Sequence, residues 1–320
     1  MQIPIWANWL LLLTGLAIIT LGGDRFTGAA VSFARRARVS EVIIGAILVS
    51  LLTTLPEFTV TIASGILDHP QTAMGNAVGS VIFNIGFILG LSLLMKPLQS
   101  TKLLLRLGIV MCLSSVVIVL LSLDGYLGRW DMLGLTLGFL VFLYYFWKQA
   151  SLERRRPVPI EEASELKSSS LIKEVIWFLL GGLGVVVGST LIVQNAVVVA
   201  RWLGVPELVI ALTIVAIGTS LPELTVGITA TIKGHGGIAA GDLIGASILD
   251  ILWVMGAGGL VFPFLPVEHQ TLVLDYPAML IIVTLLAVFL AAQKKLSRLS
   301  GVILLTVYIG YLAALFLFFG

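Results

Sequence analysis

Two short stretches place groups that can bind a cation inside long apolar runs. Leu52-Thr-Thr-Leu-Pro-Glu57 and Gly218-Thr-Ser-Leu-Pro-Glu223 each combine hydroxyls, a proline and a carboxylate. A proline inside a helix removes one N–H and clashes with the carbonyl four residues earlier, so each proline is expected to free that carbonyl. Freed carbonyls, hydroxyls and carboxylates are hard oxygen ligands, which Ca²⁺ and Na⁺ prefer. The two stretches therefore predict a buried cation site.

The composition of the chain indicates a polytopic membrane protein and excludes a soluble enzyme. Its 320 residues are 58% hydrophobic and only 11% charged, with a mean hydropathy of +1.09. A spanning helix needs about 20 apolar residues, so the length allows about ten such helices. The net charge of +2 gives no reason to expect a nucleic-acid partner. The single cysteine, Cys112, excludes an intramolecular disulfide. No feature indicates a cofactor or an obligate protein partner.

Ten apolar segments are expected to cross the bilayer as helices, which predicts an all-α fold. They cover residues 6–33, 39–67, 72–95, 103–123, 128–149, 170–201, 206–232, 238–262, 270–292 and 298–319. The one long polar connection, residues 150–169, divides the chain into two halves of five helices each, residues 1–149 and 170–320.

The basic residues are concentrated on one predicted side of the membrane. Of the 19 Lys and Arg, 16 lie in or beside the connections that follow the odd-numbered segments, and two lie on the opposite side. Cytoplasmic loops of membrane proteins carry an excess of Lys and Arg. We therefore expect both termini outside the cell and the linker 150–169 in the cytoplasm. The compact chain, without a large insert, favours a plasma-membrane protein of prokaryotic type.

The two halves contain an internal repeat. Residues 39–94 align with residues 205–260 at a constant offset of 166, and 20 of the 56 aligned positions are identical. Because each half has an odd number of helices, the second half must cross the membrane in the opposite direction to the first. Inverted repeats are typical of secondary transporters, in which the substrate binds near the bilayer midplane.

Acidic residues within the predicted spans are candidate functional groups, since a carboxylate there costs about 2.5–3.5 kcal/mol on insertion scales. Glu57 and Glu223 occupy equivalent positions of the repeat, so a pseudo-two-fold axis can bring them face to face. Two carboxylates that close could not both stay ionised in apolar surroundings without a cation between them. Asn84 and Asp250 are also equivalent, and can point at the two glutamates from flanking helices.

These motifs resemble the two alpha repeats of the cation/calcium antiporter superfamily, and most closely the sodium/calcium exchangers of prokaryotic type. The resemblance is specific over residues 39–94 and 205–260. It implies ten transmembrane helices in two inverted five-helix repeats. Helices 2, 3, 7 and 8 would form the site, and helices 1 and 6 would slide across them to alternate access.

The resemblance also implies which residues bind ions. Ca²⁺ would be bound by Thr53, Glu57, Thr219 and Glu223. Sites for Na⁺ or H⁺ would use Ser80, Asn84 and Asp250, with backbone carbonyls near Ser50 and Ala216.

The sequence departs from the family pattern at three positions. Leu52 stands where the motif usually has glycine, and Asp242 where it has asparagine. Asp242 is expected near a helix N-terminus, where a carboxylate is stabilised by the helix dipole. Ala246 stands where a serine usually supplies a Na⁺ ligand, and the next residue, Ser247, points about 100° away on an ideal helix. The missing hydroxyl leaves Ca²⁺ ligation intact but affects one Na⁺ site.

We therefore expect a secondary antiporter in the lipid bilayer that exchanges Ca²⁺ for Na⁺ and is not an enzyme. A Ca²⁺/H⁺ exchanger is the first alternative, since buried carboxylates can carry protons. A cation channel is the second, and would pass ions without a counter-ion. An intramembrane enzyme is least favoured, because the chain has no HExxH or GxSxG motif.

Overall fold

The computed structural model describes residues 4–67, 69–153, 171–204 and 218–319. Within these ranges, nine helical segments are long and apolar enough to cross a membrane, and each coincides with an expected span. The tenth expected span, residues 206–232, is described only from residue 218 onward, where helix α13 (Leu221–Lys233) forms its second part.

The helices of the first half of the chain agree with the apolar segments to within a few residues. They are α1 (Ile5–Ala37), α2 (Glu41–Ile44), η1 (Gly45–Val49), α3 (Ser50–Thr53), α4 (Leu55–Ile66), α5 (Pro70–Ile82), η2 (Phe83–Leu89), α6 (Gly90–Met95), α7 (Lys102–Leu121) and α8 (Arg129–Glu153). Segments η1 and η2 are π-helical turns within the second and third spans. Helix α8 continues past the expected start of the linker at residue 150.

The described helices of the second half follow the same order. They are α10 (Leu171–Trp202), α13, α14 (Gly236–Leu249), the π-helical η4 (Asp250–Gly258), the short 3₁₀ turn η5 (Gly259–Val261), the π-helical η6 (Thr271–Asp275), α15 (Tyr276–Ala292) and α16 (Arg298–Phe319).

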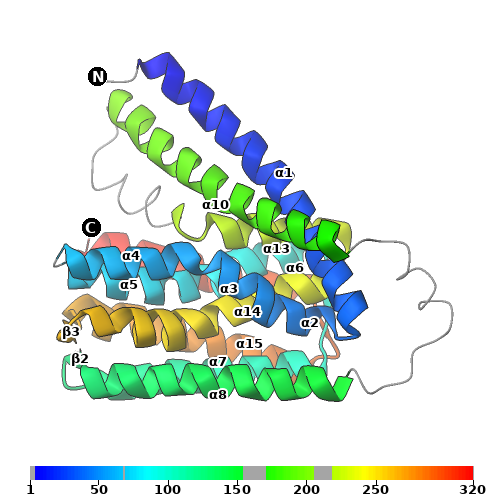
Figure 1. The fold of residues 1–320 in the computed structure, drawn as a ribbon. Coiled ribbons are helices and arrows are strands. Elements are labelled where there is room, and N and C mark those ends of the chain that lie inside the picture. Colours follow the sequence, from blue (N-terminus) through cyan, green and yellow to red (C-terminus); the bar gives the residue numbers. More distant parts are fainter. Residues whose placement is uncertain (1–3, 68, 154–170, 205–217, 320) are drawn as a thin grey trace.

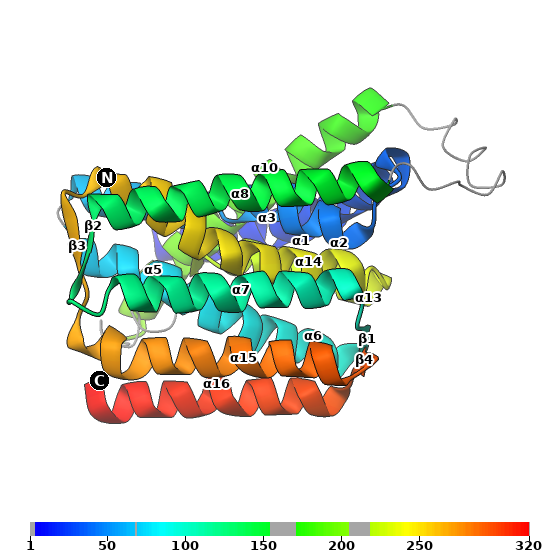
Figure 2. The ribbon, with the colours of Figure 1, turned by 90° about the horizontal axis from the view of Figure 1, so that it is seen from below.

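The helices form three layers. Helices α1 and α10 make a pair on one face and are inclined to the other helices (Figure 1). Helices α7, α8 and α15 lie on the opposite side, and α16 packs beside α15 and α6 at one edge of the bundle (Figure 2). The segments between these layers are those that carry the two repeat motifs. Two of them, Pro70–Met95 and Gly236–Val261, are the most buried of the nine described spans, with 72% and 78% of the residues in their apolar stretches buried inside the protein. Buried polar groups on these two spans are therefore removed from both lipid and water.

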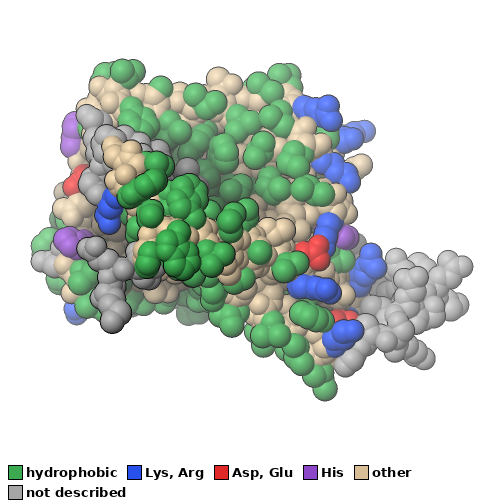
Figure 3. All heavy atoms as spheres, turned by 90° about the horizontal axis from the view of Figure 1, so that it is seen from above, with side chains coloured by type: hydrophobic (Ala, Val, Ile, Leu, Met, Phe, Trp, Pro, Cys, Tyr) green, Lys and Arg blue, Asp and Glu red, His purple; other side chains and the backbone are tan. Residues whose placement is uncertain are grey.

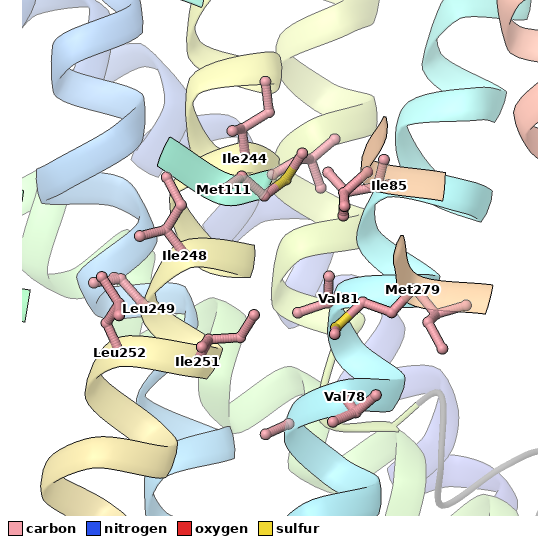
Figure 4. Packing of buried hydrophobic residues seen from close by; sticks show 14 of the residues in the cluster. Val78, Val81, Ile85, Met111, Ile244, Ile248, Leu249, Ile251, Leu252 and Met279 are labelled. Carbon is pink, nitrogen blue, oxygen red and sulfur yellow. The ribbon is translucent and has the colours of Figure 1, made fainter. Parts of the chain in front are cut away.

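An apolar cluster holds the middle layer against the outer one. In Figure 4, Val78, Val81 and Ile85 of the third span lie opposite residues of α14 and η4, with Met111 of α7 and Met279 of α15 closing the gaps. All five of these side chains are fully buried. Lipid tails are as apolar as these residues, so the cluster stabilises the fold by close packing rather than by removal from water.

Helices α1 and α10 approach each other at glycines. A Cβ atom at Gly22 would lie 2.8 Å from the carbonyl oxygen of Gly181, and one at Gly188 would lie 2.9 Å from that of Gly15. Small residues of this kind let helix backbones pack closely in a membrane. Gly15 and Gly181 are 166 residues apart in sequence, and so are Gly22 and Gly188. The two close contacts are therefore related by the offset of the sequence repeat.

Two short antiparallel ladders close the ends of the bundle. Strand β1 (Leu98–Gln99) pairs with β4 (Lys295–Leu296), and β2 (Tyr126–Gly128) pairs with β3 (Phe264–Pro266). The ladders lie at opposite ends of the molecule (Figure 2). Each joins the connection after the third helix of one half to the connection before the last helix of the other.

The two ends of the molecule also differ in the number of basic side chains that they carry. In Figure 3, hydrophobic side chains cover most of the visible face, and most visible Lys and Arg side chains gather at the end where α8 finishes. That end also carries β1 and β4.

Candidate cation site

The second span is interrupted at its motif, as the sequence predicts. Thr54, with φ −80° and ψ 0°, separates α3 from α4, and Pro56 lies in the first turn of α4. A turn also comes directly before α13, where Pro222 lies in the first turn. Proline fits a first helical turn because its missing N–H has no partner to lose there. Each proline therefore restarts a helix, and Glu57 and Glu223 follow in the first turns, where the helix dipole stabilises a carboxylate.

The third and eighth spans change to π-helix beside the two other predicted polar residues. Asn84 is the second residue of η2, and Asp250 is the first residue of η4. Single π-helical turns are rare and occur frequently at functional sites. Both side chains are at most 1% exposed. Their polar atoms, Oδ1 and Nδ2 of Asn84 and both carboxylate oxygens of Asp250, have no hydrogen-bond partner within the described ranges.

The two halves meet at Glu57. The hydroxyl of Ser220, from the turn before α13, donates to Oε1 of Glu57 at 3.3 Å and lies 3.1 Å from the hydroxyl oxygen of Ser80. Oε2 of Glu57 is buried and has no partner in the described part of the chain. Ser220 was not among the predicted site residues, although its hydroxyl lies within the second motif, directly after Thr219.

The motif threonines make equivalent contacts. Thr53 donates to Oδ1 of Asp242 at 3.0 Å, and Thr219 donates to Oδ1 of Asn76 at 3.1 Å. Asp242 and Asn76 are equivalent positions of the repeat, so one contact is made twice, once with a carboxylate and once with an amide. The expectation that Asp242 lies near a helix N-terminus is wrong. Helix α14 begins at Gly236, and Asp242 is fully buried in its second turn.

Glu223 brings further negative charge to the same region. It is 1% exposed, and its Oε2 atom lacks a partner among the described residues. Glu57, Asp242 and Asp250 are all close enough to interact electrostatically with it. No Lys, Arg or His is among the buried residues of the described ranges. Buried charges are costly unless they are paired or bind metal ions, so the excess of acidic groups favours a bound cation.

The candidate ligands are chemically mixed. Over the described ranges, no three His, Cys, Asp or Glu side chains gather closely enough to hold a metal ion by themselves. The region instead combines carboxylates with hydroxyls, an amide and main-chain oxygens. A set without thiolate or imidazole suits Ca²⁺ and Na⁺, whereas structural zinc sites use Cys and His.

The remaining predicted residues surround this centre. Ser50 is buried, its hydroxyl donates to the carbonyl of Ala46 at 2.8 Å, and its own carbonyl oxygen lies 3.3 Å from the hydroxyl oxygen of Thr53. Ala216 lies outside the described residues. Ala246 is fully buried, and the hydroxyl of Ser247 bonds to the carbonyl of Leu243 in its own helix. Ser247 therefore does not replace the hydroxyl that is missing at position 246.

A protein-family model described as sodium/calcium exchanger protein matches residues 7–148 and 173–317 of this chain. The chain belongs to the sodium/calcium exchanger family. It is 30% identical to sodium/calcium exchanger MaX1 of Methanosarcina acetivorans, over 98% of this chain and 99% of that protein. It is 33% identical to inner membrane protein YrbG of Escherichia coli, over 96% of each.

Solved structures agree with this membership. The sodium-calcium exchanger NCX_Mj, soaked with Na⁺ and Sr²⁺, superposes with a TM-score of 0.86 and 31% identity, over 97% of this chain and 99% of that one. The chain is thus a multi-pass membrane protein of a family of cation antiporters, and its relatives are transporters rather than enzymes.

Proposed function

We propose that this chain exchanges Ca²⁺ for Na⁺ across the plasma membrane by alternating access to one buried site. The observation that carries the proposal is the pair of motif glutamates. Glu57 and Glu223 are both buried in the middle layer, and each keeps a carboxylate oxygen without a partner among the described residues. Two such carboxylates neutralise the charge of one Ca²⁺.

Thr53 and Thr219 complete the proposed Ca²⁺ site with Glu57 and Glu223. A hydroxyl that donates its hydrogen keeps two lone pairs. Because Thr53 donates to Asp242 and Thr219 to Asn76, both oxygens can still accept a cation while their orientation is fixed. Ca²⁺ commonly binds carboxylate and other oxygen ligands together, which this set provides.

Na⁺ would bind at overlapping positions. We assign it to Ser80, Asn84 and Asp250 and to the carbonyls of Ser50 and Ala216. Several Na⁺ distributed over these oxygens would compete with Ca²⁺ for Glu57 and Glu223. Occupancy of shared ligands by either ion, but not both, produces antiport.

Inverted topology would give the site access to both sides of the membrane. Three pairs of contacts related by the repeat support it: the glycine contacts between α1 and α10, the ladders at opposite ends, and the two threonine contacts. They support ten spans in two five-helix repeats, 1–149 and 170–320. Helices α1 and α10, which contact each other at glycines, are the helices that would slide across the middle layer. The gathering of Lys and Arg at one end (Figure 3) supports a cytoplasmic linker and external termini.

The test is uptake of radiolabelled Ca²⁺ into proteoliposomes of the purified protein. One arm uses vesicles loaded with Na⁺ and diluted into Na⁺-free buffer at fixed pH, and the other uses a pH gradient without Na⁺. The proposal predicts uptake only in the Na⁺ arm. Uptake driven only by the pH gradient would establish Ca²⁺/H⁺ exchange instead, and uptake indifferent to both gradients would indicate a channel.

A further inference from the structure

The two halves of the middle layer differ at two positions of α14. Asp242 faces Thr53, whereas the equivalent Thr219 faces the neutral amide of Asn76. Ala246 stands at the position equivalent to Ser80. Asp242 and Ala246 are four residues apart, so they share one face of the helix. One face of α14 has therefore lost a hydroxyl and gained a carboxylate.

The loss at Ala246 leaves one oxygen cluster incomplete. In the other half, Ser80, Ser220 and Glu57 are joined by two hydrogen bonds. The equivalent residues are Ala246, Thr54 and Glu223. The hydroxyl of Thr54 and Oε2 of Glu223 are both buried and have no partner in the described part of the chain. Two of the three oxygens are present there, and the third is not.

The carboxylate of Asp242 lies one helical turn before Ala246 on α14 and adds oxygens that can bind a cation. Its Oδ1 atom accepts from Thr53, and its Oδ2 atom is buried with no partner within the described ranges. The hydroxyl oxygen of Thr53 also lies 3.3 Å from the carbonyl oxygen of Ser50. Carboxylate, hydroxyl and carbonyl oxygens thus meet in a region where none of the described buried side chains is basic. An ionised carboxylate there is strongly destabilised unless a cation binds it or a proton neutralises it.

We propose that Asp242, Thr53 and the carbonyl of Ser50 form an additional binding subsite for an alkali-metal cation, Na⁺ or K⁺. The inference rests on the proposed exchange function and adds one bound monovalent cation to each chain. The equivalent position at Asn76 and Thr219 holds the same hydroxyl without a charge, so the subsite is confined to one side of the pseudo-symmetric centre.

The charges in the middle layer support this subsite. Glu57, Glu223, Asp242 and Asp250 are all at most 1% exposed. One Ca²⁺ balances two of these four carboxylates. A monovalent cation at Asp242 neutralises a third carboxylate without using either glutamate, and it shares the oxygens of Thr53 and Ser50 with the proposed Ca²⁺ and Na⁺ sites.

The test counts bound ions on the purified, full-length protein. Saturation binding of radiolabelled Na⁺ is measured in one arm and of radiolabelled Rb⁺, which stands for K⁺, in the other. The variant is Asp242→Asn, which reproduces the Asn76 contact, and the control is Glu268→Gln, which removes an exposed carboxylate outside the middle layer. We expect D242N to bind one alkali cation fewer per chain than the wild type and E268Q. The arm in which the difference occurs identifies the ion.

Equal numbers of bound ions in D242N and the wild type, in both arms, would overturn the subsite and make Asp242 a neutral partner of Thr53. Absence of any bound alkali cation in the wild type would overturn it as well. Size-exclusion chromatography reports whether D242N is folded, and Asp242→Ser carries the same expectation if D242N aggregates. Na⁺-driven Ca²⁺ uptake by the wild type is measured in parallel. Intact uptake with equal ion counts contradicts only the subsite, whereas absent uptake contradicts the exchange function.

Discussion

Thr53 of α3 and Asp242 of α14 are 189 residues apart in sequence and joined by a buried hydrogen bond of 3.0 Å. The equivalent bond between Thr219 and Asn76 is 3.1 Å long. Each bond fixes a motif threonine of one half against a helix of the other half: Thr53 against α14, and Thr219 against α5. The orientation of the proposed Ca²⁺ ligands therefore depends on how the two halves pack together, not on either motif alone.

Removing one threonine hydroxyl should weaken Ca²⁺ binding without abolishing exchange. In Thr219→Val the shape of the side chain is kept, but one proposed ligand oxygen is lost. We expect the Ca²⁺ concentration for half-maximal uptake to rise about tenfold, which corresponds to about 1.4 kcal/mol. The measurement is the dependence of Na⁺-driven uptake on Ca²⁺ concentration.

The matched control for this prediction is Thr59→Val. The hydroxyl of Thr59 is exposed and bonds to the carbonyl of Leu55 within α4, away from the site. A Ca²⁺ dependence of T219V equal to that of T59V would remove Thr219 from the proposed ligands.

Restoring the hydroxyl at position 246 should strengthen Na⁺ binding. Ala246→Ser would supply the hydroxyl that Ser80 supplies in the equivalent cluster; Thr54 and Glu223, the other two members here, each keep a buried oxygen without a partner in the described part of the chain. We expect the Na⁺ concentration for half-maximal Ca²⁺ release from loaded vesicles to fall by several-fold, since one net hydrogen bond or ligand contact contributes about 1 kcal/mol. Ser247→Ala is the control, because that hydroxyl bonds within its own helix. An unchanged Na⁺ dependence in A246S would contradict the interpretation that the hydroxyl missing at position 246 belongs to a Na⁺ site.

Much of the architecture follows from the sequence because long apolar runs with turn signals between them define spanning helices. Nine described spans begin and end within a few residues of the expected positions, and the interruption before Pro56 follows from the geometry of proline alone. The short ladders did not follow, since strands such as Leu98–Gln99 are too short to carry an alternating pattern.

The site was predicted less completely than the helices. Glu57 and Glu223 stand out because a carboxylate in an apolar span is rare. The contact of Ser220 with Glu57 depends on packing between the halves, which no local pattern encodes. Asp242 was misplaced because the glycines at Gly236, Gly237 and Gly241 obscure where α14 begins. Helix α14 begins at Gly236, so Asp242 lies beyond the first turn, where the helix dipole has little effect on a carboxylate.

The interface between α1 and α10 should be intolerant of a single added methyl group. At Gly22 a Cβ atom would lie within 3.0 Å of three backbone atoms of α10. Overpacking of this kind costs typically about 1–3 kcal/mol. If these helices slide during exchange, Gly22→Ala should slow Na⁺-driven Ca²⁺ uptake about tenfold or more while equilibrium binding of Ca²⁺ persists.

Gly28→Ala provides the comparison on the same helix, because a Cβ atom there would meet nothing within 4 Å. Uptake rates and thermal unfolding in detergent are measured for both variants. Equal uptake rates for G22A and G28A would argue against movement at this interface.

The most direct test of the central claim is Na⁺-driven uptake of radiolabelled Ca²⁺ by Glu57→Gln and Glu223→Gln in proteoliposomes. Each change keeps the shape of the side chain and removes one buried charge. Breaking a buried charge pair costs about 3–5 kcal/mol, so we predict that initial uptake at low Ca²⁺ falls at least about 100-fold in either variant, while the exposed control E268Q matches the wild type. Full uptake by E57Q or E223Q would contradict a shared carboxylate site for Ca²⁺ and Na⁺.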